Sequence, residues 1–194
     1  MRASLILAGV ALAFATPAAA QELVTNGGFE TGDFAGWTQS GNTGFTGVQG
    51  GGVEASGSFG AFFGPIGSIG TITQTLATNV GQSYLISFDL LNQGGNPNFY
   101  NVTFGGLSLF SATDSAEFGY TNFSTTATAA SASTNLAFNF QHNPRFWFLD
   151  NVSVTAVNGA VPEPATWAMM LIGFFGLGAA LRRRRQITET PQFA

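Results

Sequence analysis

Tyr84-Leu-Ile-Ser-Phe-Asp-Leu90 decides the fold class, because every second side chain in it is large and apolar. Leu136-Ala-Phe-Asn-Phe140 repeats the pattern. A period of two residues is typical of a β-strand with one face buried and the other in solvent. No stretch around these segments shows a sustained apolar face at helical spacing. The sequence therefore predicts a domain built from strands.

Other short apolar segments extend this prediction in both directions. Further strands are expected at Thr43–Val48, Gly60–Phe63, Thr71–Leu76, Phe99–Phe104, Leu107–Phe110, Phe123–Ala127 and Phe146–Val157. Clusters of glycine, asparagine and proline separate them, at residues 92–97, 105–106 and 142–144. Eight or more short strands with turn signals between them favour an all-β fold, a β-sandwich of jelly-roll type.

The first 20 residues have the layout of a secretory signal. Arg2 precedes an apolar stretch from Leu5 to Phe14, and the small residues Ala18-Ala-Ala20 follow. This three-part order is typical of a cleaved signal peptide. We expect residues 1–20 to be removed and the β-sandwich domain to occupy residues 21–159.

The C-terminal 35 residues predict a membrane segment. Residues 160–164 form a linker that contains Pro162-Glu163-Pro164, and residues 165–181 carry no charge. Arg182, Arg183, Arg184 and Arg185 follow, and residues 182–194 form a basic tail. A helix over residues 165–181 is about 25 Å long, which is short for a transmembrane helix. If it spans the inner membrane, the arginines stay in the cytoplasm and the domain lies in the periplasm.

This segment closely resembles the PEP-CTERM sorting signal of Gram-negative bacteria. The resemblance rests on Pro162-Glu163-Pro164, on the apolar helix with its spaced glycines, and on the arginine block. It implies recognition by an exosortase, cleavage near the proline motif, and transfer to the cell surface or an exopolysaccharide matrix. Such tails are also labelled the C-terminal domain of ice-binding proteins, a name that is no evidence of ice binding. The alternative is a membrane anchor that is never processed.

Composition limits the partners of the domain. The chain has no cysteine, so disulfides cannot stabilise it after export. Arg145 is the single cation between residues 21 and 159, against Glu22, Glu30, Asp33, Glu54, Asp89, Asp114, Glu117 and Asp150. A surface of this kind repels phosphate backbones and argues against nucleic acid. It suits neutral partners rich in hydroxyl groups.

Two motifs at opposite ends of the domain resemble the galactose-binding-like jelly rolls, which include many carbohydrate-binding modules. One motif is Asn26-Gly-Gly-Phe-Glu30 with Trp37 after it, and the other is Phe146-Trp-Phe-Leu-Asp-Asn-Val-Ser-Val154. The resemblance covers almost all of residues 22–157. It implies the same fold and a carbohydrate-binding role.

The same motifs suggest a structural calcium ion. In an antiparallel sandwich the first and last strands commonly pair, which would bring Glu30 and Asp150 together at one edge. Two adjacent carboxylates repel each other unless a cation lies between them. Ca²⁺ prefers such oxygen ligands, and the resemblance implies that these two residues supply its side-chain ligands. The alternative is that both carboxylates accept hydrogen bonds from backbone amides in turns.

Catalysis is not expected. His142 is the single histidine and lies in a predicted turn, where a solvated side chain is the favoured interpretation. One histidine and no cysteine exclude a zinc site built on several such ligands. Glycoside hydrolysis needs two carboxyl groups, which Glu30 with Asp33 or Asp114 with Glu117 could supply. A small glycoside hydrolase is the least favoured alternative.

A sugar site would place an aromatic ring against a pyranose and surround it with polar groups. The candidates are the rings of Tyr100, Trp147 and Tyr120 with Asn92, Asn98 and Arg145 as polar neighbours. The alternative is that these rings pack in the core. Two functions stay open: a surface protein that binds exopolysaccharide or another glycan, and a structural or adhesion protein that binds other proteins or itself.

Overall fold

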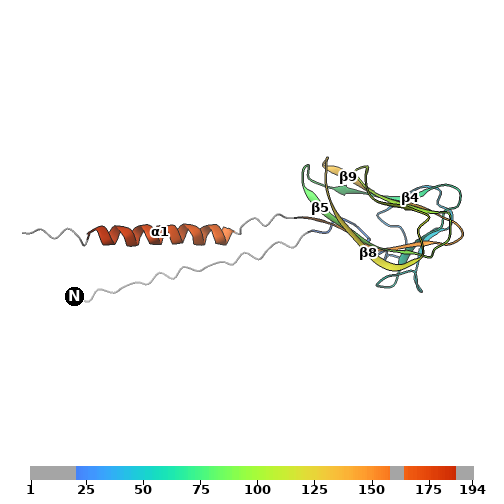
Figure 1. Cartoon of the computed structure of the whole chain (residues 1–194), viewed down its shortest axis with the longest axis horizontal. Helices are drawn as coiled ribbons and strands as arrows, with labels where there is room; N and C mark the ends of the chain where they lie inside the picture. Colours follow the sequence, from blue (N-terminus) through green and yellow to red (C-terminus); the bar gives the residue numbers. More distant parts are fainter. Residues whose placement is uncertain (1–20, 158–163, 187–194) are drawn as a thin grey trace, which may run out of the picture. The chain divides into compact units, whose positions relative to one another are not determined.

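A computed structural model describes residues 21–157 and 164–186. The predicted signal peptide, Pro162, Glu163 and residues 187–194 of the tail lie outside the described residues. The chain divides into two units, and one of them, Ala20–Asn158, contains all the described strands. Figure 1 shows that this unit has two layers of strands.

Two five-stranded antiparallel sheets form the domain. The first sheet has the order β2 (Thr46–Gln49), β3 (Gly60–Phe63), β10 (Trp147–Ala156), β5 (Ser83–Asn92) and β8 (Phe118–Thr128). The second sheet has the order β1 (Thr38–Gly41), β4 (Gly70–Ala77), β9 (Ser133–His142), β6 (Asn98–Phe104) and β7 (Leu107–Thr113). The predicted jelly-roll β-sandwich is therefore confirmed.

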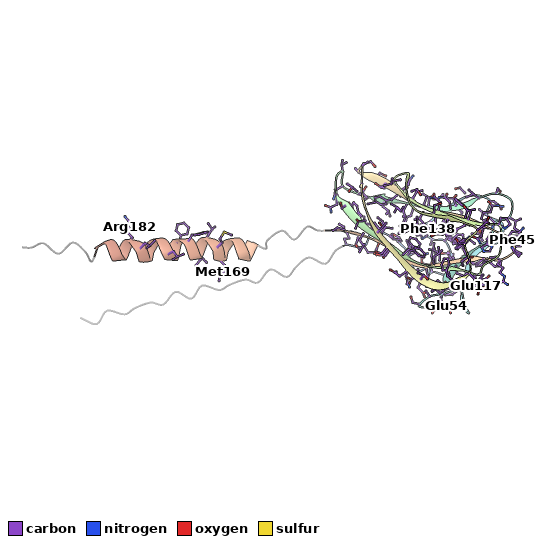
Figure 2. All side chains as sticks on the ribbon, viewed as in Figure 1. Phe45, Glu54, Glu117, Phe138, Met169 and Arg182 are labelled. Atoms are coloured by element: carbon purple, nitrogen blue, oxygen red, sulfur yellow. The ribbon has the colours of Figure 1, made fainter. Side chains whose placement is uncertain are left out.

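The core lies between the two sheets and is rich in aromatic rings. The alternating residues of β5 and β9 point into it, and Phe88 and Phe138 are fully buried. Their rings meet edge to face with centroids 5.2 Å apart, and Phe63 stacks on Phe140 at 4.3 Å. Figure 2 labels Phe138 between the layers. Aromatic pairs of this geometry add to the free energy gained by burial, so packing stabilises a domain that has no disulfide.

The predicted strand Thr43–Val48 is wrong in its bounds. The chain turns between Gly41 and Phe45, both of which have positive φ, and forms β1 before the turn and β2 after it. The Asn42 side chain closes the turn by accepting a hydrogen bond from Gly44 N at 3.0 Å. Because β1 pairs with β4 and β2 pairs with β3, the chain changes sheets at this point.

The N-terminal segment runs beside the last strand, as predicted, but not at an edge. Leu23 N donates to Val154 O at 3.0 Å, and Val152 N donates to Gly27 O at 2.9 Å. Strand β3 pairs with the first half of β10, and the N-terminal segment pairs with its second half. Strand β10 itself lies in the centre of its sheet, between β3 and β5.

The other unit contains the helix α1 (Pro164–Gln186). Proline suits the first position of a helix, where its missing N–H has no partner to lose. The described side chains from Met169 to Gly178 are all exposed, and Figure 2 labels Met169 and Arg182 on the helix. Over the described residues, no helix combines the length and the apolar character that crossing a membrane requires. The predicted helix is thus present, without support for its prediction as a transmembrane segment.

Candidate functional site

Two of the three aromatic residues predicted to contact sugar, Tyr100 and Trp147, lie in the core, whereas Tyr120 is partly exposed on β8 and its hydroxyl donates to Val53 O. Trp147 has no exposed surface and Tyr100 is 6% exposed. Their ring centroids are 5.0 Å apart, and Trp147 Nε1 donates to Gln141 O at 3.2 Å. Both residues belong to the inward rows of their strands, so their rings face the opposite sheet. The prediction that they form a binding platform is wrong, and the packing alternative is correct.

Asn98 is also buried, and its side chain joins two turns. Asn98 Nδ2 donates to Gly95 O at 2.7 Å and to Ser115 O at 2.9 Å, while Asn98 Oδ1 accepts from Ser115 N at 3.0 Å. These bonds satisfy backbone groups that turns leave without partners. The prediction of Asn98 as a ligand-binding residue is therefore wrong.

His142 is fully buried at the end of β9, so the prediction of a solvated side chain is wrong. Its Nε2 lies 3.0 Å from Asn92 Oδ1. Asn92 Nδ2 donates to the carbonyls of Ser115 and Ala116, which makes Oδ1 the acceptor and assigns the proton to Nε2. Nδ1 is buried and has no hydrogen-bond partner among the described residues. Burial, and next the charge of Arg145, lower the pKa of His142 to about 4.

This histidine is expected to make stability depend on pH. Because its pKa is lower in the folded state, the unfolded state binds the extra proton first, and stability falls as the pH drops from about 6.5 to about 4. The difference corresponds to about 3 kcal/mol. Urea unfolding at pH 7 and pH 4 should show a smaller acid loss in His142→Gln, whose amide can still donate to Asn92. An equal loss in both proteins would contradict this assignment.

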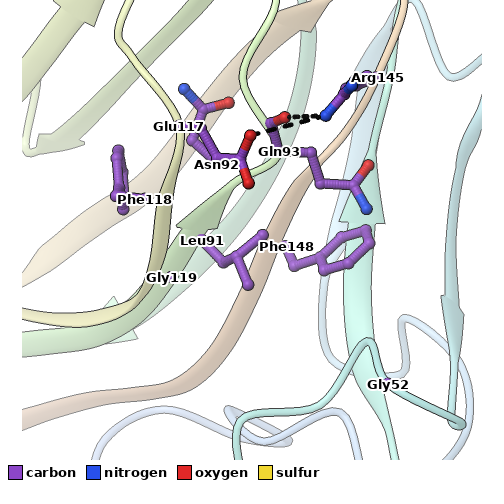
Figure 3. Close-up of a pocket in the computed structure, with 9 residues that line it drawn as sticks. All are labelled: Gly52, Leu91, Asn92, Gln93, Glu117, Phe118, Gly119, Arg145 and Phe148. Atoms are coloured by element: carbon purple, nitrogen blue, oxygen red, sulfur yellow. Dashed lines mark hydrogen bonds and ion pairs between the residues drawn. The ribbon is translucent and has the colours of Figure 1, made fainter.

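Arg145 borders an open groove of about 340 Å³ on the outer side of the first sheet. Arg145 Nη1 donates to Gln93 O at 2.7 Å and lies 3.7 Å from a Glu117 carboxylate oxygen. Figure 3 shows the guanidinium directed at both groups. Leu91 and Phe148 supply apolar lining. Of the six residues considered for a ligand site, Arg145 is the one with an exposed side chain, and Tyr120 is partly exposed.

Glu30 and Asp150 come together, as predicted. A Cβ added at Gly28 would lie 3.6 Å from Asp150 Oδ1 and 3.8 Å from Glu30 Cγ. Both carboxylates also hold the loop between β2 and β3. Glu30 accepts from Ser58 N at 2.9 Å, and Asp150 Oδ2 accepts from Ala55 N at 2.8 Å.

Asp150 is fully buried, whereas Glu30 is exposed. Burial raises the pKa of Asp150, its backbone hydrogen bonds oppose that shift, and the charge of Glu30 raises the pKa further. The amide contacts expected by the alternative interpretation are therefore present, together with the repulsion that a cation would relieve.

Two side-chain oxygens lie near Gly28: Asp150 Oδ1 and Asn151 Oδ1 are 3.6 and 4.0 Å from the position that a Gly28 Cβ would take. The Glu30 carboxylate approaches with its Cγ, and its oxygens accept from Ser58 N and Phe59 N. Ca²⁺ takes carboxylate, amide and backbone oxygens. Within residues 21–157 and 164–186, no group of three or more histidine, cysteine or acidic side chains could hold a metal ion. Any cation here would thus depend on two carboxylates, with neutral oxygens as its remaining ligands.

The outer face of the second sheet carries hydroxyl and amide groups without charge. Its outward residues are Thr38 and Ser40 of β1, Thr71, Thr73 and Thr75 of β4, Asn135, Ala137 and Asn139 of β9, Phe99, Asn101 and Thr103 of β6, and Ser108, Ser111 and Thr113 of β7. We call this surface the polar face. In β4, β6 and β9 each member alternates with a buried residue, whereas β1 is exposed at all four positions and β7 has a register shift between Ser108 and Ser111.

Hydrogen bonds cross the polar face from strand to strand. Thr71 Oγ1 donates to Asn139 Oδ1 at 2.9 Å, and Asn139 Nδ2 donates to Asn101 O at 3.1 Å. Asn101 Nδ2 in turn donates to Ser108 Oγ at 2.6 Å. These bonds fix the side chains of four neighbouring strands. No sequence motif predicted this surface. The predicted strands nevertheless carried threonine, serine and asparagine at their outward positions, which is the pattern that forms it.

The fold is a jelly-roll β-sandwich similar to those of carbohydrate-binding modules. The structure resembles TmCBM61 in complex with β-1,4-galactotriose, with a TM-score of 0.55 and 15% identity over 69% of this chain and 97% of that one. It also resembles the CBM22-1 xylan-binding domain of Paenibacillus barcinonensis Xyn10C, with a TM-score of 0.54 and 17% identity over 75% and 100%. A third similar structure is the K3 cleaved adhesin domain of Lys-gingipain from Porphyromonas gingivalis, with a TM-score of 0.51 and 17% identity over 71% and 99%.

No curated protein matches the chain in sequence. Residues 160–185 match the PEP-CTERM protein-sorting motif. The predicted resemblance is therefore confirmed, and the chain carries this sorting signal behind a sandwich of the carbohydrate-binding-module type. The signal implies export and sorting to the cell surface by an exosortase.

Proposed function

We propose that the protein is a non-catalytic surface protein whose sandwich binds a neutral polysaccharide of the exopolysaccharide matrix on the polar face. The observation that carries this proposal is the network from Thr71 through Asn139 and Asn101 to Ser108, which presents fixed donors and acceptors without a charge. The hydroxyl groups of a neutral glycan can both donate and accept hydrogen bonds. Phe99 adds a partly exposed ring on which the C–H face of a sugar could rest.

Weakly charged surroundings support a neutral ligand over an acidic one. The polar face has no cation to attract a uronate, and all acidic residues of the domain lie elsewhere. Of the four candidate catalytic carboxylates, Glu30, Asp33 and Asp114 accept local hydrogen bonds, and Glu117 lies beside Arg145. Asp33 accepts from Thr31 and Ala35, and Asp114 accepts from Asn98 N at 3.2 Å. These bonds favour structural roles over glycoside hydrolysis.

The double variant Asn101→Ala/Asn139→Ala tests the proposal. It breaks the network at its centre and should weaken binding of the chain to purified neutral exopolysaccharide at least tenfold in affinity electrophoresis. The matched control is Ser87→Ala/Ser124→Ala, a cross-strand pair on the outer face of the first sheet. Equal binding by the double variant and the native chain would reject the polar face as the site.

Sorting places this binding surface outside the cell. We propose that an exosortase cuts near Pro162–Pro164 and transfers the domain to the surface or the matrix. Support comes from the motif match, which includes the proline motif and the arginine block. Replacement of Arg182–Arg185 by glutamine should leave the unprocessed chain in the cell fraction of a fractionated culture.

We also propose a structural calcium ion at Glu30 and Asp150. Ligand binding to the folded state alone stabilises it, by about 2.7 kcal/mol at a hundredfold excess over Kd. Unfolding in calcium should therefore have a higher midpoint than unfolding in chelator, and Glu30→Gln should reduce the difference. Identical midpoints for the native chain would show that the amide contacts suffice.

An adhesion role is the second candidate. Phe45, Ile66 and Ile69 are 63%, 47% and 42% exposed on two turns that are hydrogen-bonded to each other. Exposed apolar side chains that gather in one place often mark contacts with proteins. Concentration-dependent self-association that Phe45→Ser abolishes would favour this function over glycan binding.

A further inference from the structure

We propose that the groove beside Arg145 is a second carbohydrate site, which takes one neutral pyranose unit, so that one domain can hold two polysaccharide segments. The groove is distinct from the polar face and is lined by different residues. Its ligand class follows from its lining, although its biological use rests on the proposed function of the protein.

The groove opens on the side of the sandwich away from the polar face. Leu91 and Phe148 belong to β5 and β10, and their neighbours Leu90 and Leu149 are fully buried in the core. Side chains alternate along a strand, so Leu91 and Phe148 point outward from the first sheet. Gly52, in the loop between β2 and β3, forms part of the opposite wall.

The lining combines an apolar floor with polar groups above it. The half-buried Leu91 can contact the C–H face of a sugar ring beside the edge of Phe148, which is 9% exposed. Gln93, Glu117 and Arg145 surround that floor. A volume of about 340 Å³ lies at the lower end of the range for small-molecule sites. Such a groove holds one ring of a chain, and its open form lets neighbouring units leave on either side.

Charge in the groove favours a neutral sugar. The Arg145 and Glu117 side chains are 57% and 72% exposed, so a ligand can reach both. Arg145 is already engaged by Gln93 O and lies beside Glu117, so the pair has no net charge. Glu117 can accept hydrogen bonds from two hydroxyl groups, and Arg145 has further N–H donors. A uronate would meet the carboxylate of Glu117 and lose affinity.

Two sites on opposite faces have a consequence that one site lacks. Packed sheets lie about 10 Å apart, and the domain itself stands between the sites. A straight polysaccharide chain cannot lie along both faces, so the second site binds a second chain. The domain would cross-link polymer, and the combined attachment would be tighter than either contact.

Gly119→Val is the blocking variant. Gly119 lines the groove on β8, and a Cβ there meets no atom within 4 Å, so valine adds bulk at the groove without a clash. The matched control is Ser124→Val on the same strand. Glu117→Ala/Arg145→Ala is the second variant, because it removes two exposed side chains and leaves the core intact.

Titration calorimetry of the full chain with β-1,4-galactotriose or xylohexaose gives the readout. We expect two ligands per native chain and per Ser124→Val chain, and one per chain for both groove variants. An oligogalacturonide should bind the groove at least tenfold more weakly than the neutral trimer. A native stoichiometry of one that the groove variants leave unchanged would overturn the inference, as would preference for the uronate. If only the polar face fails to bind, the result is different. The native chain then binds one ligand, the groove variants bind none, and Asn101→Ala/Asn139→Ala still binds one.

Discussion

Trp147→Ala is expected to lower the free energy of unfolding by about 4 kcal/mol, because it removes a large, fully buried side chain. The ring packs against Tyr100, Phe118, Phe140 and His142, so no single neighbour can fill the cavity. The loss also leaves Gln141 O without the indole donor. Chemical denaturation monitored by circular dichroism measures the change.

Trp147→Phe is the matched control. It retains an aromatic ring and should cost less than half as much as alanine. Glycan binding provides the opposing test. If Trp147 contacted sugar, its substitution would lower the affinity for glycan while the protein stayed folded. Native stability combined with lost glycan binding in Trp147→Ala would restore the original prediction of a ligand-binding role.

Asp150→Ala should lower stability by a similar amount, about 4 kcal/mol. Its buried carboxylate accepts hydrogen bonds from the backbone N–H groups of Ala55, Ser56 and Asn151, at 2.8, 3.0 and 2.7 Å. Hydrogen bonds to a charged group contribute about 1.5–3 kcal/mol each, and buried donors left without a partner are costly. Unfolding in the presence of chelator isolates this contribution from any effect of calcium.

Glu117→Ala is a suitable control for Asp150. Its side chain is 72% exposed and forms one long ion pair, so its removal should change stability by less than about 0.5 kcal/mol. Limited proteolysis adds a local readout, since the loop between β2 and β3 should become the first cleavage site in Asp150→Ala. Equal protection of the loop in Asp150→Ala and the native chain would show that other contacts hold it.

The strands were predictable because one physical signal determines them. Residues 84–90 and 136–140 alternate between core and solvent, and the structure follows that alternation through both sheets. The meeting of Glu30 and Asp150 was predictable because the first and last strands of an antiparallel sandwich commonly pair. The central position of β10 was not, because the order of strands depends on long-range pairing that local patterns do not encode.

Other features were misjudged although a signal was present. Tyr100 lies on the same face of its strand as Val102 and Phe104, which places its ring inside. Trp147 shares a face with Leu149 in the same way. His142 ends an alternating strand, so its burial follows from the same rule. The polar face escaped notice because each of its threonines and asparagines is ordinary alone and only strand pairing assembles them.

The place of β10 bears on how such a domain leaves the cell. Without residues 147–156, the first sheet lacks the strand that joins β3 to β5, and the segment at Leu23 lacks its partner. A ribosome must therefore synthesise nearly the whole domain before its two layers can close. For the export that the sorting signal implies, this order means that the first sheet cannot be completed until residues 147–156 have joined β3 and β5.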